Sequence, residues 1–267
     1  MNIYLYTIIF IMGALFGSFY TLAVYRIPKK IDITHTHSFC PNCGHKLGFF
    51  ELIPILSYIF LGGKCKSCKQ KIRPRYFIFE ILSGLTFVLI AHSLKVNVYN
   101  LELNIIIRFI FIVLYLVAVF LIAGIDKEYR IIEKSVLYYS FVISSAYIIY
   151  LCIMAQTSIY RYVMYLITLI ILLILDNIKQ VKEAKTSYFI SILMLIVVML
   201  INIGELVTLL SIVVVFLAIA IVRIGCYLKN ILNKSKKETK DMTEIYKFGY
   251  LLTVSSLIIF IGELYFK

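Results

Sequence analysis

The 267-residue sequence is short of charge and contains no tryptophan. Charged residues make up 15% of it, against about 25% in an average soluble domain. Hydrophobic residues make up 62%, and the mean hydropathy is +0.95. This balance excludes an ordinary soluble globule. Six cysteines are too few for a secreted disulfide scaffold, and no glycine-rich phosphate-binding loop is present.

Long uncharged runs take the place of the missing charge. Residues 3–25 carry no charged side chain, and residues 186–222 carry only Glu205. A helix needs about 20 apolar residues to span a bilayer. We therefore predict an all-α polytopic membrane protein with about eight transmembrane helices. The predicted spans are residues 4–25, 77–94, 105–125, 135–155, 162–177, 187–203, 206–223 and 248–265. The sixth and seventh are divided at the polar turn of residues 202–205.

The basic residues alternate with these spans. Four of the connections hold 23 of the 27 lysines and arginines: residues 26–76, 126–134, 178–186 and 223–247. The positive-inside rule therefore places these four connections in the cytoplasm and both termini outside. The net charge of +13 lies at membrane boundaries, which favours contact with membrane lipid and argues against a nucleic-acid partner. The oligomeric state stays undefined. We divide the chain into a first helix (1–25), a cytoplasmic loop (26–76) and a seven-helix membrane domain (77–267).

The first cytoplasmic loop contains two C-x-x-C pairs, Cys40 with Cys43 and Cys65 with Cys68. A two-residue spacer lets both sulfurs of a pair bind one tetrahedral ion. Because the cytoplasm is reducing, a metal site is favoured over disulfides, although two reduced and unpaired cysteine pairs remain the alternative. Four thiolates complete the coordination sphere of Zn²⁺. We therefore predict a structural zinc knuckle, in which His45 is not needed as a ligand.

Several motifs resemble the bacterial type IV prepilin peptidase family in their order and spacing. The motifs are Gly17-Ser18-Phe19, Tyr25-Arg26-Ile27-Pro28, Glu51-Leu52-Ile53-Pro54-Ile55-Leu56-Ser57-Tyr58, Arg75-Tyr76-x-x-x-Glu80-x-x-x-Gly84, Ile125-Asp126 and Phe248-Gly249-Tyr250, together with the two cysteine pairs. The resemblance implies a multi-pass enzyme of the bacterial cell membrane, with its active site at the cytoplasmic face. Its expected activity is aspartic endopeptidase cleavage of the leader of prepilin or pseudopilin substrates. Members of this family often also methylate the new N-terminus with S-adenosylmethionine, for which this sequence shows no pocket signature.

An aspartic peptidase needs two neighbouring carboxylates, one ionised to activate water and one protonated to donate to the scissile carbonyl. The chain has four aspartates, and of these only Asp126 and Asp176 are predicted at membrane-helix ends on the cytoplasmic side. Carboxylates at that depth are functional candidates. Asp126 also matches the first catalytic aspartate of the family. For Asp176 the alternative is an interfacial carboxylate that headgroup water reaches.

The second aspartate of the family lies in a Gly-x-Gly-Asp motif, and this sequence contains no such tetrapeptide. One alignment places Phe189 at the aspartate position, and another brings Glu183 near it. The second carboxylate is therefore Asp176, Glu183 or absent. If it is absent, the chain is a catalytically degenerate relative that binds prepilins or assembly proteins without cutting them. A transporter is disfavoured, because neither a discontinuous helix nor a half-repeat is visible.

Overall fold

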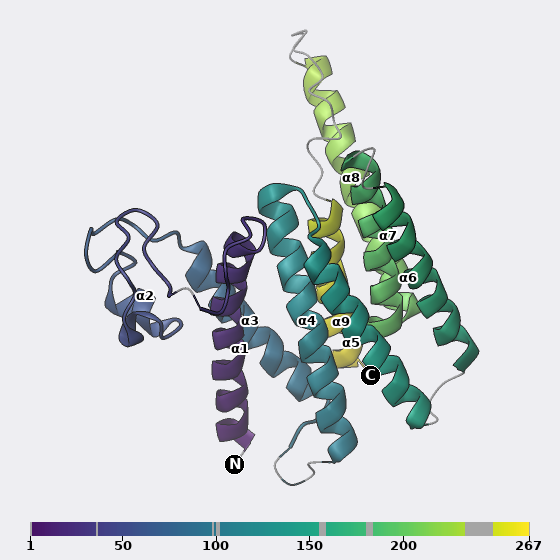
Figure 1. Cartoon of the computed structure of the whole chain (residues 1–267), viewed down its shortest axis with the longest axis horizontal. Helices are drawn as coiled ribbons and strands as arrows, with labels where there is room; N and C mark the ends of the chain where they lie inside the picture. Colours follow the sequence, from purple (N-terminus) through teal and green to yellow (C-terminus); the bar gives the residue numbers. More distant parts are fainter. Residues whose placement is uncertain are drawn as a thin grey trace. The chain divides into compact units, whose positions relative to one another are not determined.

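The computed structural model describes residues 2–35, 37–97, 99, 102–154, 159–179, 184–232 and 248–266. Eight long helices occur in this part of the chain: α1 (Asn2–Arg26), α3 (Arg75–Ser93), α4 (Leu103–Tyr129), α5 (Lys134–Ile153), α6 (Ile159–Lys179), α7 (Ala184–Ile203), α8 (Glu205–Leu232) and α9 (Phe248–Phe266) (Figure 1). Between α1 and α3 lie a 3-10 turn, η1 (Phe49–Glu51), and a short helix, α2 (Leu56–Phe60). Among the described residues there is no β-strand, only two isolated bridges.

The all-helical membrane architecture predicted from the sequence is confirmed, and each predicted span corresponds to one long helix. Six of the helices are long and apolar enough to cross a bilayer: α1, α3, α4, α5, α8 and α9. The apolar part of α7, Tyr188–Ile203, is shorter. The predicted break between the sixth and seventh spans is also found, because α7 ends at Ile203 and α8 begins at Glu205. Between them Gly204 adopts a φ of 88°, which a side chain would disfavour.

The chain forms two compact units, Met1–Val113 and Leu114–Lys267, with the boundary inside α4. In the first unit α1 and α3 lie side by side (Figure 1). Glycines allow their backbones to approach closely, since a Cβ at Gly13 would lie 2.8 Å from the Gly84 Cα. A Cβ at Gly17 would likewise lie 2.8 Å from the Glu80 Cα. Gly13 and Gly17 are four residues apart and therefore share one helix face, the usual small-residue contact of membrane helices.

In the second unit, α7 packs against α5, α6, α8 and α9. Its buried side chains, including Met194, Leu195 and Met199, form much of the core of this unit. The C-terminal half of α4 is buried as well, without interruption from Tyr115 to Asp126. Outward-facing leucines, valines and isoleucines remain exposed along α8, as expected for a surface covered by lipid.

Candidate functional site

The four loop cysteines form one cluster. Their sulfurs all lie within 4.8 Å of one another, with 3.9 Å between Cys40 and Cys68 and 4.0 Å between Cys43 and Cys65. Sulfurs bound tetrahedrally to zinc at about 2.3 Å would be about 3.8 Å apart. The donor set and its spacing therefore fit one Zn²⁺. Because all four positions are taken by thiolates, the ion would have a structural role.

Two matching backbone turns build this cluster. In the first, Gly44 N–H donates to Cys40 O and Cys40 N–H donates to His45 O. In the second, Lys69 N–H donates to Cys65 O and Cys65 N–H donates to Gln70 O. Each turn needs one residue of positive φ, Gly44 at 70° and Lys69 at 58°. The near-identical turns explain why both C-x-x-C pairs present their sulfurs to the same point.

Hydrogen bonds around the cluster hold its neighbours in place. Hydrogen bonds from the Gln70 backbone N–H and the Asn42 side chain lower the pKa of the Cys68 thiol to about 6, whereas burial and the neighbouring thiols raise the pKa of Cys43 to about 11. His45 lies beside the cluster and contacts Glu51, with 3.1 Å between Nε2 and Oε2. The Gly48 backbone N–H, which also donates to this carboxylate, lowers the pKa of Glu51. This pairing agrees with a four-cysteine site that does not use His45.

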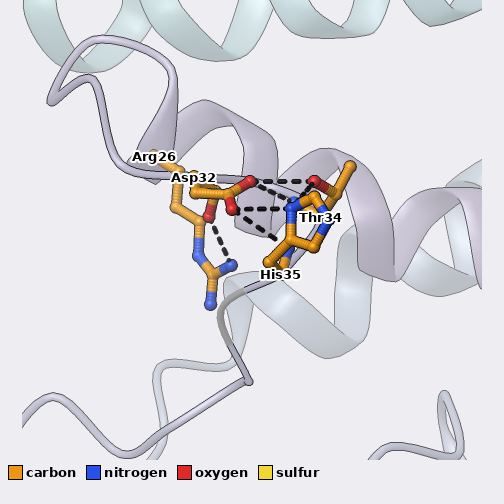
Figure 2. Close-up of polar contacts among 4 residues, drawn as sticks. All are labelled: Arg26, Asp32, Thr34 and His35. Carbon is orange, nitrogen blue, oxygen red and sulfur yellow. Dashed lines mark hydrogen bonds and ion pairs between the residues drawn. The ribbon is translucent and has the colours of Figure 1, made fainter.

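The start of the loop is fixed by Arg26, the last residue of α1. Arg26 is buried, and its guanidinium donates to the backbone oxygens of Asp32 at 2.9 Å and His37 at 3.1 Å. The Asp32 carboxylate accepts hydrogen bonds from the backbone and hydroxyl of Thr34 and contacts the His35 ring (Figure 2). The Thr34 backbone bond is the main cause of a lowered pKa for Asp32. Asp32 is thus engaged in a local turn of the loop.

Asp126 lies near the C-terminal end of α4 and is completely buried. Its Oδ1 accepts a hydrogen bond of 2.8 Å from the Tyr188 hydroxyl of α7. Its Oδ2 accepts one of 2.7 Å from the Tyr250 backbone N–H of α9. Donors on both oxygens compensate for the cost of burying a charged carboxylate.

The first turn of α9 is shaped around this carboxylate. A Cβ at Gly249 would lie 3.2 Å from Oδ2 of Asp126, so a larger residue would crowd it. The Gly249 backbone N–H donates to the Tyr188 hydroxyl at 3.3 Å. The first N–H groups of a helix have no partner within the helix and favour negative charge. The Phe-Gly-Tyr sequence therefore presents the start of α9 to Asp126 and Tyr188.

Asp176 lies near the end of α6 and is also buried. Its Oδ2 is 2.6 Å from Nζ of Lys134, the first residue of α5. This ion pair gives the carboxylate a partner within the protein. A third candidate, Glu183, lies outside the described residues.

Tyr188 is the site residue that the sequence reasoning missed. The alignment with the family motif directed attention to the next residue, Phe189, whose side chain is 60% exposed. In the structure the Tyr188 hydroxyl donates a hydrogen bond to Asp126. The clue available in the sequence was a tyrosine inside the segment where the family has Gly-x-Gly-Asp.

Comparison with known proteins finds similarity to one group of bacterial peptidases. Residues 11–94 match the bacterial peptidase A24 N-terminal domain. A prepilin leader peptidase/N-methyltransferase of Vibrio cholerae serotype O1 is 33% identical over 154 residues, which cover 54% of this chain and 57% of that protein. These similarities support the prepilin peptidase family for this chain.

Relatives of the same name include one from Bacillus subtilis, 44% identical over 81 residues (30% of this chain, 33% of the relative). Another relative, from Myxococcus xanthus, is 39% identical over 79 residues, which cover 30% of this chain and 24% of that relative. The chain thus spans about half the length of the Vibrio protein and less of the others. No solved structure gives a significant match. The four cysteines and Glu80 lie inside residues 11–94, whereas Asp126 and Asp176 lie outside them.

Proposed function

We propose that this chain is a member of the prepilin peptidase family and acts as an aspartic endopeptidase, which removes the leader of prepilin or pseudopilin substrates at the cytoplasmic membrane face. Asp126 would be its first catalytic carboxylate. The observation that carries the proposal is the completely buried Asp126 carboxylate, held by donors from two other helices. Burying an ionisable group near a membrane boundary is costly and is typical of functional sites.

Cleavage by this mechanism requires a second carboxylate close to Asp126. One group would take a proton from water while the other donates a proton to the carbonyl oxygen of the scissile peptide bond. Asp176 and Glu183 are the two candidates for that role. For Asp176 to contact the substrate, it would first have to separate from the Lys134 ammonium, which lies 2.6 Å from its Oδ2.

The proposal includes an orientation in the bacterial cell membrane. Both termini would face outward, and the cysteine loop and the Asp126 end of α4 would face the cytoplasm, as the distribution of basic residues favours. Zn²⁺ held by the four cysteines would stabilise the loop. For S-adenosylmethionine, no group of the described residues forms a pocket that we can assign to it, so we derive no methyl-transfer step.

A second candidate function is binding of prepilins or assembly proteins without cleavage. Two contacts favour this function. The Tyr188 hydroxyl donates a hydrogen bond to Asp126, and Lys134 forms an ion pair with Asp176. A phenol cannot share a proton with Asp126 as a second carboxylate does, because phenols stay protonated at neutral pH. In this case the chain would retain the substrate-binding surface and lack the acid–base pair.

Co-expression with a prepilin separates the two functions. The endopeptidase proposal predicts that mass spectrometry finds the shortened prepilin, and that Asp176→Asn or Glu183→Gln abolishes the shortening and so identifies the second carboxylate. The binding proposal predicts that the prepilin stays full-length and co-purifies with the chain. In that case, replacing Thr186, Tyr188 and Phe189 with Gly, Gly and Asp should restore cleavage, since this returns the family motif.

A further inference from the structure

The loop between α1 and α3 exposes large apolar side chains in one short stretch, residues 49–60. Phe49, Phe50 and Phe60 are 78%, 80% and 81% exposed. Leu52, Leu56 and Ile59 are also exposed, at 44–57%. Such an apolar cluster outside the predicted spans requires a covering partner. We refer to residues 49–60 as the aromatic segment.

Two contacts hold the aromatic segment beside the beginning of α3 (Figure 1). The Ile55 backbone N–H donates to Oε2 of Glu80 at 2.7 Å. The Tyr58 ring stacks on Phe77, with 5.0 Å between centroids. Glu80 is five residues after the start of α3, which is about 7 Å along the helix axis. The segment therefore lies level with the first turns of a membrane helix and does not extend away from the membrane.

The backbone of Ile55 is strained, and this strain supports the position of the aromatic segment beside α3. Ile55 has φ 65° and ψ −56°, a conformation that is unfavourable for a β-branched residue. Its N–H is the group that Glu80 binds, and Glu80 is itself buried. The hydrogen bond thus holds the turn before α2 against α3.

Charge around the aromatic segment identifies the chemistry of its partner. Residues 46–73 contain five lysines and one arginine, all exposed: Lys46, Lys64, Lys66, Lys69, Lys71 and Arg73. The only acidic residue in this range is Glu51, whose carboxylate already contacts Gly48 and His45. Aromatic side chains next to clustered lysines are typical of protein surfaces that enter the headgroup region of anionic membranes.

We propose that the aromatic segment is an interfacial anchor seated among the headgroups of the leaflet that faces the cysteine loop. Its phenylalanines insert at the boundary between headgroups and acyl chains, and the surrounding basic residues bind anionic lipid. Both ends of the loop continue into membrane helices, α1 and α3, which keep the segment at the bilayer surface. The anchor would fix the cysteine cluster against the membrane, and the proposal does not depend on peptidase activity.

The absence of tryptophan permits a direct test with the full chain. Phe50→Trp and Phe60→Trp each introduce a single fluorophore into the anchor. Gln70→Trp, at an exposed position of the same loop outside the aromatic segment, is the matched control. Each variant is reconstituted into phosphatidylcholine vesicles with or without phosphatidylglycerol, and quenching is measured with lipids brominated on the acyl chains. Zinc content reports whether the loop has folded.

We expect bromolipid to quench the Phe50→Trp and Phe60→Trp variants at least twofold more strongly than the Gln70→Trp control, with a blue-shifted emission. Quenching should increase when phosphatidylglycerol is present, and the double change Lys71→Gln and Arg73→Gln should reduce that increase. Equal quenching of all three variants in zinc-loaded protein would overturn the proposal. A second result would also overturn the proposal: lipid does not quench the fluorophores at positions 50 and 60, but an added prepilin peptide protects them from quenching by acrylamide. In that case the surface would bind protein and not lipid.

Discussion

The hydrogen bond from Tyr188 to Asp126 makes a quantitative prediction. Tyr188→Phe keeps the ring but removes the hydroxyl that lies 2.8 Å from Oδ1, leaving one oxygen of a completely buried carboxylate without this donor. Hydrogen bonds to charged groups contribute about 1.5–3 kcal/mol. We therefore expect the free energy of unfolding to fall by about 2 kcal/mol. If Asp126 is catalytic, losing about 2 kcal/mol of transition-state stabilisation would lower kcat about 30-fold.

A double-mutant cycle isolates this contact. The variants Tyr188→Phe and Asp126→Asn, separately and together, are unfolded reversibly in detergent micelles and followed by circular dichroism. Tyr188→Phe should cost much less in the Asp126→Asn background, because the charged partner is already gone. Tyr250→Phe is the control, since Tyr250 contributes its backbone N–H, which the substitution keeps. If Tyr188→Phe costs the same in both backgrounds, the hydroxyl does not act through Asp126, and our description of the site is wrong.

Three further predictions concern metal, packing and topology. Purified protein should hold about one zinc per chain by elemental mass spectrometry. Cys40→Ser or Cys65→Ser should release the zinc and unfold the knuckle, because ion binding supplies folding free energy to such knuckles. Full zinc in a variant lacking all four loop cysteines would contradict the assignment. Gly17→Ala should destabilise the fold by about 1–3 kcal/mol in thermal unfolding, since its Cβ would lie 2.8 Å from backbone, whereas Gly262→Ala, with open space around it, should be neutral or slightly stabilising. Reporters fused after residues 33 and 235 should read as cytoplasmic and one after residue 98 as external; an external signal at 235 would contradict the predicted alternation.

The helices and the cysteine cluster could be predicted because each depends on local sequence. Uncharged runs of about 20 residues dictate membrane helices, and the C-x-x-C spacing dictates which sulfurs can share an ion. Helix ends were less accurate. The third span was predicted to end at residue 125, but α4 continues to Tyr129, since Asp126 finds partners inside the unit and does not need to end the helix at water.

The contacts of the two aspartates could not be predicted in the same way. Apolar residues surround most of these helices on every side, so sequence periodicity gives little information about which faces meet. The partner of Asp126 is a tyrosine 62 positions away, and that of Asp176 is a lysine on another helix. The Glu80 carboxylate accepts a hydrogen bond from the Ile55 backbone, a contact that no side-chain pattern in the sequence indicates.

The most direct test of the central claim is the rate at which the reconstituted protein removes a prepilin leader. Wild-type chain, Asp126→Asn and the matched control Glu128→Gln, an exposed carboxylate two residues away, are compared in the same vesicles at equal zinc content. Our account predicts cleavage by the wild type and by Glu128→Gln, and none above background by Asp126→Asn. Undiminished cleavage by Asp126→Asn would contradict the catalytic role of Asp126, and absence of cleavage by the wild type would contradict the peptidase function itself.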